Sequence, residues 1–564
     1  MLERKSLFQF GYRRSPDQDA GRPARHRVII VGAGPVGLSL AIDLAQRGVA
    51  VVILDDADRI GEGSRGICYA KRTLEIWDRL GVGDRMVEKG VTWRRGKVFQ
   101  GQDVLYEFDL LPESGHKRPA FINLQQFHVE NFLVDRAGGM EGIDLRWRNK
   151  VTGVAPDPMG AEVTVETPDG PYRLAADWLI ACDGARSTLR ALLGIEFSGE
   201  SFEDQFLIAD IKMHADLPTE RRFWFDPVFH SGQSALMHRQ PDDVWRIDLQ
   251  LGRYADADAE KRTESVRPRI EKMLGHGKFD IEWVSVYQFQ CRRIAHFVHG
   301  RVVFCGDSAH QVSPFGARGA NSGVQDAENL AWKLALVLDA KAGASLIDSY
   351  ALERGQAADD NIRHSTRSTD FIAPHSAAEA RLRDAALSLA RHAEFAKRMV
   401  NSGRLSTASA YDTPLSTPDA EEWAGGVPPG AAMQDARLRR ATGEAVFLTD
   451  IVAPRFTLLV AGARSDAWGP LSKPLPILAL PGAPKSGKPD SANSTANEAD
   501  LVAIGLTAQD EVELHDAEGQ FAERYDASQG SAYLLRPDGH VAARFREVSA
   551  ERLELALARA CGEG

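Results

Sequence analysis

The chain has 564 residues, 43% hydrophobic and 26% charged, which is typical of a soluble globular protein with several domains. Its formal net charge of −11 argues against a general nucleic-acid binder, since there is no basic excess to neutralise phosphates. Five widely spaced cysteines without a C-x-x-C pair argue against a disulfide framework or a zinc site and favour a cytoplasmic protein. From the same cysteine spacing we expect no metal. No apolar run reaches the roughly eighteen residues of a membrane helix, so we also expect no membrane partner.

The N-terminal segment, residues 1–25, combines basic residues with Phe8 and Phe10. It lacks the apolar stretch of a signal peptide. We expect a flexible leader, with an arm that packs on a neighbouring subunit as the alternative.

A pattern of strand, glycines and helix follows. The β-branched residues 28–31 predict a buried parallel strand, which leads into Gly-Ala-Gly-Pro-Val-Gly and an Ala/Leu-rich helix over 38–47. Gly32 permits the tight turn, Gly34 lets a pyrophosphate approach the backbone, and Gly37 lets the helix pack closely on the strand.

The acidic residue that this pattern requires ends the next predicted strand, residues 50–54. Asp55 is placed to accept hydrogen bonds from an adenosine ribose. Strand, glycines, helix, strand and acid in this order predict a dinucleotide site rather than a plain strand–helix turn. Further on, Arg65 lies in a glycine-rich loop and either faces an anionic group or is solvated. Gln126 begins a predicted helix and is either a ligand contact or a surface residue.

Two later strand ends also carry an acid. The predicted strand 176–182 ends in Asp183-Gly184, and the strand 302–305 ends in Gly306-Asp307, followed by a Pro/Gly loop and a helix over 324–338. Glycines clustered around one acid indicate backbone close to a flat or phosphorylated group. His310 in this loop is either catalytic or, more in keeping with such loops, a bridge between backbone groups.

Between these motifs, residues 201–295 alternate in hydrophobicity and predict an antiparallel sheet with one face packed. We expect its aromatic residues, such as Phe225, to be core residues, and the alternative is that they line a pocket. Residues 345–407 predict helices, and strands and helices alternate from residue 431. Residues 478–480 predict a strand, and the low-complexity segment 484–500 predicts a mobile loop.

Together the three motifs resemble the single-component FAD-dependent aromatic hydroxylases, flavoprotein monooxygenases typified by para-hydroxybenzoate, phenol and 3-(3-hydroxyphenyl)propionate hydroxylases. The resemblance covers about residues 26–400. The tail around residues 533–539 resembles the thioredoxin-like C-terminal domain of the phenol hydroxylase branch, without its C-x-x-C. This implies a packing or dimerisation role, and therefore a homodimer.

The resemblance implies an α/β fold in which a Rossmann-type FAD-binding domain is interleaved with a mixed or antiparallel β-sheet substrate domain, followed by a thioredoxin-like α/β domain. The implied boundaries are a leader over 1–25, the FAD-binding domain over 26–95, 122–200 and 296–375, the substrate domain over 96–121 and 201–295, a helical connector over 376–430, and the C-terminal domain over 431–564.

The resemblance also implies site residues. Those assigned to the cofactor are Gly32, Gly34 and Gly37 (pyrophosphate), Asp55 (ribose), Arg65, Gln126, Asp183 and Gly184 (FAD and NAD(P)H), Gly306 and Asp307 (ribityl chain), and Pro314, Gly319, Ala320 and Asn321 (isoalloxazine). The residues assigned to the substrate are Arg246, which resembles a family arginine near the flavin, and Pro314 and Arg318 of the loop, together with Phe225 and His238, which are candidates from the predicted sheet rather than from the resemblance. Arg318 departs from the Gly-Gln-Gly of the family, and its extra cation indicates either an anionic substrate or a local salt bridge.

The implied reaction is hydroxylation of a phenolic substrate with NAD(P)H and O₂ through a flavin C4a-hydroperoxide. A phenol has a pKa of about 10, so a base or hydrogen bonds must assist its ionisation; His230, His238, Tyr254 and Tyr287 are equal candidates. Alternatives are an FAD monooxygenase or oxidase acting on a polyketide-like substrate, and a flavin-binding protein without turnover. A halogenase is disfavoured because W-x-W-x-I-P is absent.

Overall fold

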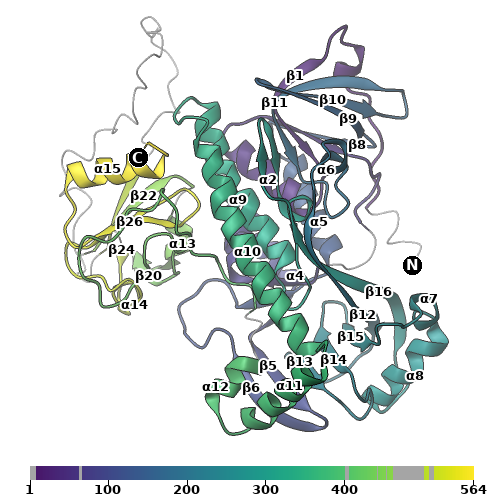
Figure 1. Cartoon of the computed structure of the whole chain (residues 1–564). Helices are drawn as coiled ribbons and strands as arrows, with labels where there is room; N and C mark the ends of the chain where they lie inside the picture. Colours follow the sequence, from purple (N-terminus) through teal and green to yellow (C-terminus); the bar gives the residue numbers. More distant parts are fainter. Residues whose placement is uncertain are drawn as a thin grey trace, which may run out of the picture. The chain divides into compact units, whose positions relative to one another are not determined.

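The computed structural model describes residues 8–61, 66–400, 405–440, 442–452, 454–461, 501–506 (backbone only) and 514–563. The chain divides into two compact units (Figure 1). Unit 1 comprises Met1–Pro112, Arg118–Ala327 and Ala358–Thr407, and unit 2 comprises Glu113–Lys117, Glu328–Ala357 and Ala408–Gly564. This division differs from the predicted boundaries, because residues 328–357 share a hydrophobic core with the C-terminal strands.

The first sheet of unit 1 is mainly parallel, in the order β17-β18-β11-β1-β2-β8. Its strands are β1 (Ala24–Val31), β2 (Val51–Asp55), β8 (Ile143–Trp147), β11 (Tyr172–Ala181), β17 (Val298–His299) and β18 (Val302–Phe304), and β9 (Lys150–Asp157) and β10 (Gly160–Glu166) extend β11 as an antiparallel hairpin. Val28, Ile29 and Ile30 are fully buried, as expected for a parallel strand covered on both faces. Helices α2 (Pro35–Gln46) and α5 (Gln126–Gly138) contact each other and this sheet (Figure 1).

The second sheet of unit 1 has the order β19-β16-β12-β15-β14-β13-β5-β6. Its strands are β5 (Arg95–Gln100), β6 (Asp103–Asp109), β12 (Ser198–Lys212), β13 (Arg221–Phe225), β14 (Ser234–Arg239), β15 (Val244–Leu251), β16 (Asp280–Arg293) and β19 (His310–Gln311). All neighbours pair antiparallel except β13 and β5. One face buries Ile247 and Leu249 against Ile270 of α8 (Thr263–Leu274), which follows the short helix α7 (Ala257–Glu260).

A small third sheet, β3 (Cys68–Ala70), β7 (Phe121–Asn123) and β4 (Val91–Trp93), completes unit 1 together with α3 (Lys71–Arg79), α4 (Gly83–Lys89), α6 (Thr188–Leu192), α11 (Ala377–Ala390) and α12 (Glu394–Val400). Helix α3 begins only at Lys71, because residues 68–70 pair with β7. Helices α9 (Gly319–Leu338) and α10 (Leu346–Ile372) contribute residues to both units.

Residues 8–25, expected to form a flexible leader, instead pack on unit 1. Phe10 stacks on Trp147 with ring centroids 4.6 Å apart. Ser15 caps a short 3-10 helix, η1 (Pro16–Asp19), whose Asp17 forms an ion pair of 2.6 Å with the buried Arg146. An aromatic stack and a half-buried ion pair hold this segment on its own chain.

Unit 2 contains a mixed sheet in the order β23-β22-β25-β26, made of β22 (Phe456–Ala461), β23 (Leu501–Leu506), β25 (Ala532–Leu535) and β26 (Val541–Phe545). Beside it are the short strands β20 (Arg437–Arg440), β21 (Ala445–Phe447) and β24 (Leu514–His515), and the helices α13 (Leu448–Ile451), α14 (Gln520–Arg524) and α15 (Ala550–Ala560). The predicted strand 478–480 and loop 484–500 lie outside the described residues.

The core of unit 2 contains a charged cluster with no solvent exposure. Arg536, in the turn after β25, binds Glu353 of α10 at 2.5 Å and Asp538 at 2.5 Å. Lys333 of α9 also binds Glu353, at 2.7 Å, and the indole of Trp332 donates to Asp538 at 3.0 Å. Burial alone would raise the pKa of Glu353, but the charges of Arg536 and Lys333 outweigh it and hold this pKa below its ordinary value. The cluster fastens the turn to two helices of the same unit.

Candidate active site

The glycine-rich turn between β1 and α2 has the geometry that a dinucleotide requires. Gly32 has φ +106°, and a Cβ there would lie 2.3 Å from the carbonyl oxygen of Cys182. A Cβ on Gly37 would lie 2.0 Å from the carbonyl oxygen of Gly32, whereas one on Gly34 would meet nothing within 4 Å. Gly34 is also the N-cap of α2, and no side chain of the described residues caps that helix. The open space at Gly34 and the free N–H groups of the first turn fit a pyrophosphate.

Asp55 lies beside this turn at the end of β2. Its Oδ2 accepts from the N–H of Ala33 at 2.6 Å and its Oδ1 from that of Ala57 at 2.9 Å. Burial raises the pKa of Asp55, and these N–H groups oppose the shift by favouring the carboxylate. The carboxylate is therefore fixed where an adenosine ribose is expected to lie.

Asp183 and Asp307 end the neighbouring strands β11 and β18. Asp183 accepts from the N–H of Leu189 at 3.0 Å, and its buried Oδ1 has no hydrogen-bond partner among the described residues. Gly184 follows with φ +74°. Asp307 is exposed in η2 (Gly306–Ser308). A buried acceptor oxygen that receives no hydrogen bond from the protein, such as Oδ1 of Asp183, fits a site where a ligand donates that hydrogen bond.

Gln126 begins α5, as predicted, and accepts from the N–H of Gly66 at 3.0 Å while donating to Glu130 at 2.7 Å. It therefore holds the end of the loop that contains Arg65, which lies outside the described residues. His310 binds Asp326 at 2.7 Å and is buried. Asp326 also accepts from the N–H of Gly306 at 2.9 Å. The histidine thus supports the loop that carries Asp307, which agrees with the non-catalytic alternative.

The loop from Pro314 to Asn321 is fixed by its last residue. Asn321 accepts from the N–H of Ala70 at 2.8 Å and donates to the carbonyl oxygen of Cys68 at 2.9 Å. Its polar atoms are therefore used within the protein. Gly319 and Ala320 begin α9 and are partly exposed, so their backbone remains accessible to a flat ring.

A cavity lies next to this loop, on the face of the second sheet opposite α8. Its lining consists of Val98, Tyr106, Phe108, Arg221, Phe223, Phe225, Phe315, Gly316, Ser368, Ile372, Val400 and Leu405. Five of these residues are aromatic, and one is charged. Such a lining suits an aromatic ring with a few polar substituents.

A polar row crosses the same sheet face behind the cavity. The strand register places His238 across from Arg246, and Arg246 across from Asp210. Arg246 is buried and donates to both oxygens of Asp210 at 2.8 Å. Since Arg222 pairs with Met237, Arg221 comes across from His238 at the open end of this row. Asp248 lies on the same face, two residues after Arg246.

One of the five predicted substrate residues lines this cavity, and the other four do not. Phe225 lines the cavity. The lining does not include Arg246, His238, Pro314 or Arg318. Arg318 is buried and donates to Asn361 of α10 at 3.0 Å, so its cation supports the loop. The cation of the cavity is instead Arg221, which is not among the predicted substrate residues. The alternation of Arg221, Phe223 and Phe225 along one face of β13 was the available signal.

The candidates for assisting the substrate's ionisation do not line the cavity either. Tyr254 is 97% exposed. His230 lies 2.6 Å from the carbonyl oxygen of Gln250, and burial lowers its pKa. His238 is buried, and burial together with the charges of Arg221 and Arg246 holds its pKa well below the ordinary value. It is therefore neutral at physiological pH.

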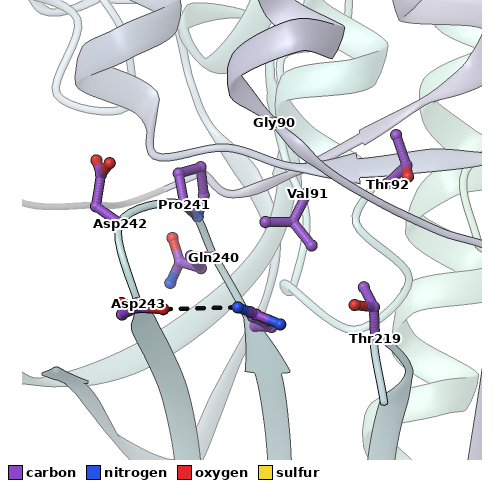
Figure 2. Close-up of a pocket in the computed structure, with 9 residues that line it drawn as sticks. Gly90, Val91, Thr92, Thr219, Gln240, Pro241, Asp242 and Asp243 are labelled. Atoms are coloured by element: carbon purple, nitrogen blue, oxygen red, sulfur yellow. Dashed lines mark ion pairs between the residues drawn. The ribbon is translucent and has the colours of Figure 1, made fainter. Parts of the chain in front are cut away.

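A second, more open hollow lies at the end of β14 (Figure 2). It is lined by Gly90, Val91, Thr92, Thr219, Arg239, Gln240, Pro241, Asp242 and Asp243. Asp243 forms the ion pair drawn there, at 3.5 Å from Arg239. The charge of Arg239 in this hollow is thus neutralised within the protein. The lining of the hollow has no aromatic residue, unlike that of the cavity beside the loop.

Comparison with known proteins identifies the family of this chain. Residues 25–365 match the family model described as FAD binding domain. The chain is 31% identical over 539 residues to 6-methylpretetramide 4-monooxygenase of Streptomyces rimosus, covering 92% of this chain and 90% of that protein. It is 30% identical over 342 residues to para-nitrophenol 4-monooxygenase of Pseudomonas sp. strain WBC-3, covering 58% of this chain and 82% of that protein.

Among solved structures, the flavin-dependent monooxygenase PieE, in complex with FAD and substrate, has the same fold. The TM-score is 0.80 at 23% identity, covering 96% of this chain and 100% of that chain. The family match covers more than half of the chain and includes the glycine turn, Asp55, Asp183 and Asp307. The chain therefore belongs to the FAD binding domain family and is a flavin-dependent monooxygenase.

Proposed function

We propose that this monooxygenase hydroxylates a phenolic aromatic compound, with NADH or NADPH as electron donor and O₂ as oxidant. The observation that carries the proposal is the aromatic cavity beside the loop of Phe315 and Gly316, which directly follows the predicted isoalloxazine contact Pro314. Bound FAD supplies the redox chemistry. The glycine turn, Asp55, Asp183 and Asp307 orient it, and the aromatic side chains exclude water from the reacting ring.

A polycyclic polyketide-type ring is the second candidate substrate. Two relatives support different choices, since one is named for para-nitrophenol and the other, which matches 92% of this chain, is named for 6-methylpretetramide. Both relatives are named 4-monooxygenases, so the class of reaction is the same.

Finer features of the fold belong to the same proposal. We infer a Rossmann-type FAD domain from the parallel sheet around β1, and a thioredoxin-like C-terminal domain from the mixed sheet of unit 2. Cys561 is the one cysteine in residues 431–564, so we assign this domain no thiol chemistry. A homodimer and a cytoplasmic location remain proposals from the sequence.

The test is substrate-stimulated NAD(P)H oxidation by the FAD-loaded protein. Of the three classes tested, phenols, nitrophenols and polycyclic phenols, at least one is expected to accelerate oxidation with formation of hydroxylated product. Product and H₂O₂ are quantified together, because an oxidase yields only peroxide. Oxidation that no phenolic compound accelerates would contradict the proposal and favour a flavin-binding protein without turnover.

Replacing Phe225 by alanine is expected to raise KM about tenfold or more, because a ring contact of about 1.5 kcal/mol or more is lost from the cavity wall. Water admitted by the gap should also raise the share of peroxide. Trp224 provides the matched control. It lies next to Phe225 on the opposite face of β13 and stacks on Phe99 with centroids 5.0 Å apart, so Trp224→Leu should affect stability without uncoupling. Equal uncoupling by both variants would contradict the placement of the substrate.

A further inference from the structure

Arg221 differs from the other arginines near it on the sheet. Arg246 binds Asp210, Arg222 binds Glu220 at 2.9 Å, and Arg239 binds Asp243 at 3.5 Å. Within the described part of the chain, no carboxylate lies within ion-pair distance of Arg221. Its guanidinium also has no hydrogen-bond acceptor there. This unpartnered cation lines the aromatic cavity.

An unpartnered cation in such a place is unfavourable for the protein alone. Burial lowers the pKa of Arg221, which expresses the cost of removing the guanidinium from water, although an arginine remains charged. The charge of Asp248 offsets this cost only in part, because burial still lowers the pKa of Arg221, and apolar residues of the wall, such as Phe223 and Val98, offer it no compensation. A bound anion would provide it with charge-assisted hydrogen bonds.

We propose that the substrate is an aromatic compound bearing an anionic oxygen, which Arg221 binds at the end of the cavity. The proposal rests on the proposed function and narrows its substrate class. The anion is either a carboxylate attached to the ring or the phenolate of the ring itself. Both present the same charged acceptor to the guanidinium.

The other polar groups of the cavity agree with an acceptor. Burial raises the pKa of Tyr106, so its phenol stays protonated and can donate a hydrogen bond. The hydroxyl of Ser368 donates to the carbonyl oxygen of His364 at 2.8 Å and is thereby held in place. Arg221 has only donors. A ligand group that matches Arg221 and Tyr106 together must accept hydrogen bonds.

The decisive experiment measures binding to the FAD-loaded full-length protein without turnover. Its probes are 2-naphthoate and the neutral isostere 2-naphthamide. The wild type is expected to bind naphthoate about tenfold or more tightly than the amide, and Arg221→Gln to remove that preference. Arg222→Gln, which removes the same charge from the other face of β13, is expected to keep it.

Folding and flavin binding are measured in parallel. Arg221→Gln is expected to retain FAD and to be at least as stable as the wild type, whereas a merely structural arginine would lose stability on replacement. Equal binding of naphthoate and naphthamide by the wild type would overturn the proposal, as would a preference that survives in Arg221→Gln. Failure of the wild type to bind the anionic probes at millimolar concentration would equally overturn it.

A second probe, 4-nitrophenol, distinguishes the two sources of the anion, since its neutral and ionised forms absorb differently. Bound 4-nitrophenolate at a pH where the free compound is mostly neutral indicates a phenolate site, and preference for naphthoate alone indicates a carboxylate site. Turnover is a separate readout. Hydroxylation of neutral phenols without any anion preference would leave the proposed function intact and reject this narrower inference.

Asp248 gives the anion site a pH dependence. Burial raises its pKa to about 6, against the opposing charge of Arg246. Its Oδ1 is buried without a hydrogen-bond partner in the described chain. The titratable or charged groups around it and Arg221 are Cys68, Tyr106, Asp210, His238 and Arg246. Burial together with the charges of Arg221 and Arg246 holds the pKa of His238 well below its ordinary value, and burial raises the pKa of Cys68 to about 11, so both pKa shifts lead away from pH 6.

Naphthalene-2-sulfonate, which stays ionised throughout, should therefore bind several-fold more tightly below about pH 6 than above it, because a protonated Asp248 no longer offsets the charge of Arg221. Asp248→Asn should abolish this step and bind the sulfonate more tightly at neutral pH. Titrations of both proteins across the range test this. A step that persists in Asp248→Asn would show that another group is responsible.

Discussion

Replacing Arg536 by methionine is expected to lower the free energy of unfolding by about 3–5 kcal/mol. The change removes the guanidinium that binds both Glu353 and Asp538 in the core of unit 2, and leaves Lys333 to bind Glu353. A buried carboxylate that loses its partner either stays charged at high cost or takes up a proton. Urea unfolding followed by fluorescence measures the loss.

Arg440→Met is the control, because the Arg440–Glu444 pair is also in unit 2 but its side chains are 44% and 69% exposed. A surface pair contributes about 0–1 kcal/mol. The difference between the variants should also depend on pH. Since the pKa of Glu353 is held below its ordinary value, its ion pairs stabilise the protein at neutral pH and are lost as the pH falls below the ordinary carboxyl range. Similar losses for both variants would contradict a buried, fully paired cluster.

The second large effect is expected from replacing either of two glycines of the glycine turn, Gly37 or Gly34, by alanine. Gly37→Ala forces a Cβ to within 2.0 Å of a backbone oxygen and should destabilise the fold and prevent FAD binding. Gly34→Ala meets no protein atom within 4 Å, and its φ of −77° suits alanine. It should leave the FAD-free protein as stable as the wild type, or about 0.4–1 kcal/mol more stable.

Gly34→Ala should nevertheless weaken FAD binding about tenfold or more, because the methyl group occupies the space through which the pyrophosphate approaches the N–H groups. Titration of the FAD-free proteins with FAD measures the affinity, and urea unfolding of the same samples measures stability. Full FAD affinity in Gly34→Ala would refute the assignment of the pyrophosphate to this turn.

The cofactor side of the site could be read from the sequence because its signals are local. The glycines, Asp55, Asp183 and Asp307 each end a strand of consecutive buried residues, and the carboxyl ends of parallel strands meet at one sheet edge. The family match and the strand order agree with that interpretation. The roles of single residues toward FAD remain predictions for the experiments above.

The substrate side could not be read in the same way, because the state of an arginine depends on distant partners. Arg246 and Arg221 both lie on strands of alternating pattern. The partner of Arg246 is Asp210, 36 residues away, and only the register of β12 with β15 brings the two together. No local pattern distinguishes the neutralised arginine from the one that faces the cavity. The leader was misjudged for a similar reason, since Phe10 stacks on a tryptophan more than a hundred residues later.

The sheet order of unit 1 also bears on biosynthesis. β18, with the loop that carries Asp307, pairs beside β11, although the whole β12–β16 region is translated between them. A nascent chain that ends before residue 302 contains the glycine turn and Asp55 but lacks β18 and the loop with Asp307. A complete cofactor site therefore requires synthesis beyond Asp307, and until then the edge of β11 that pairs with β18 has no partner strand, which is the kind of edge that favours aggregation.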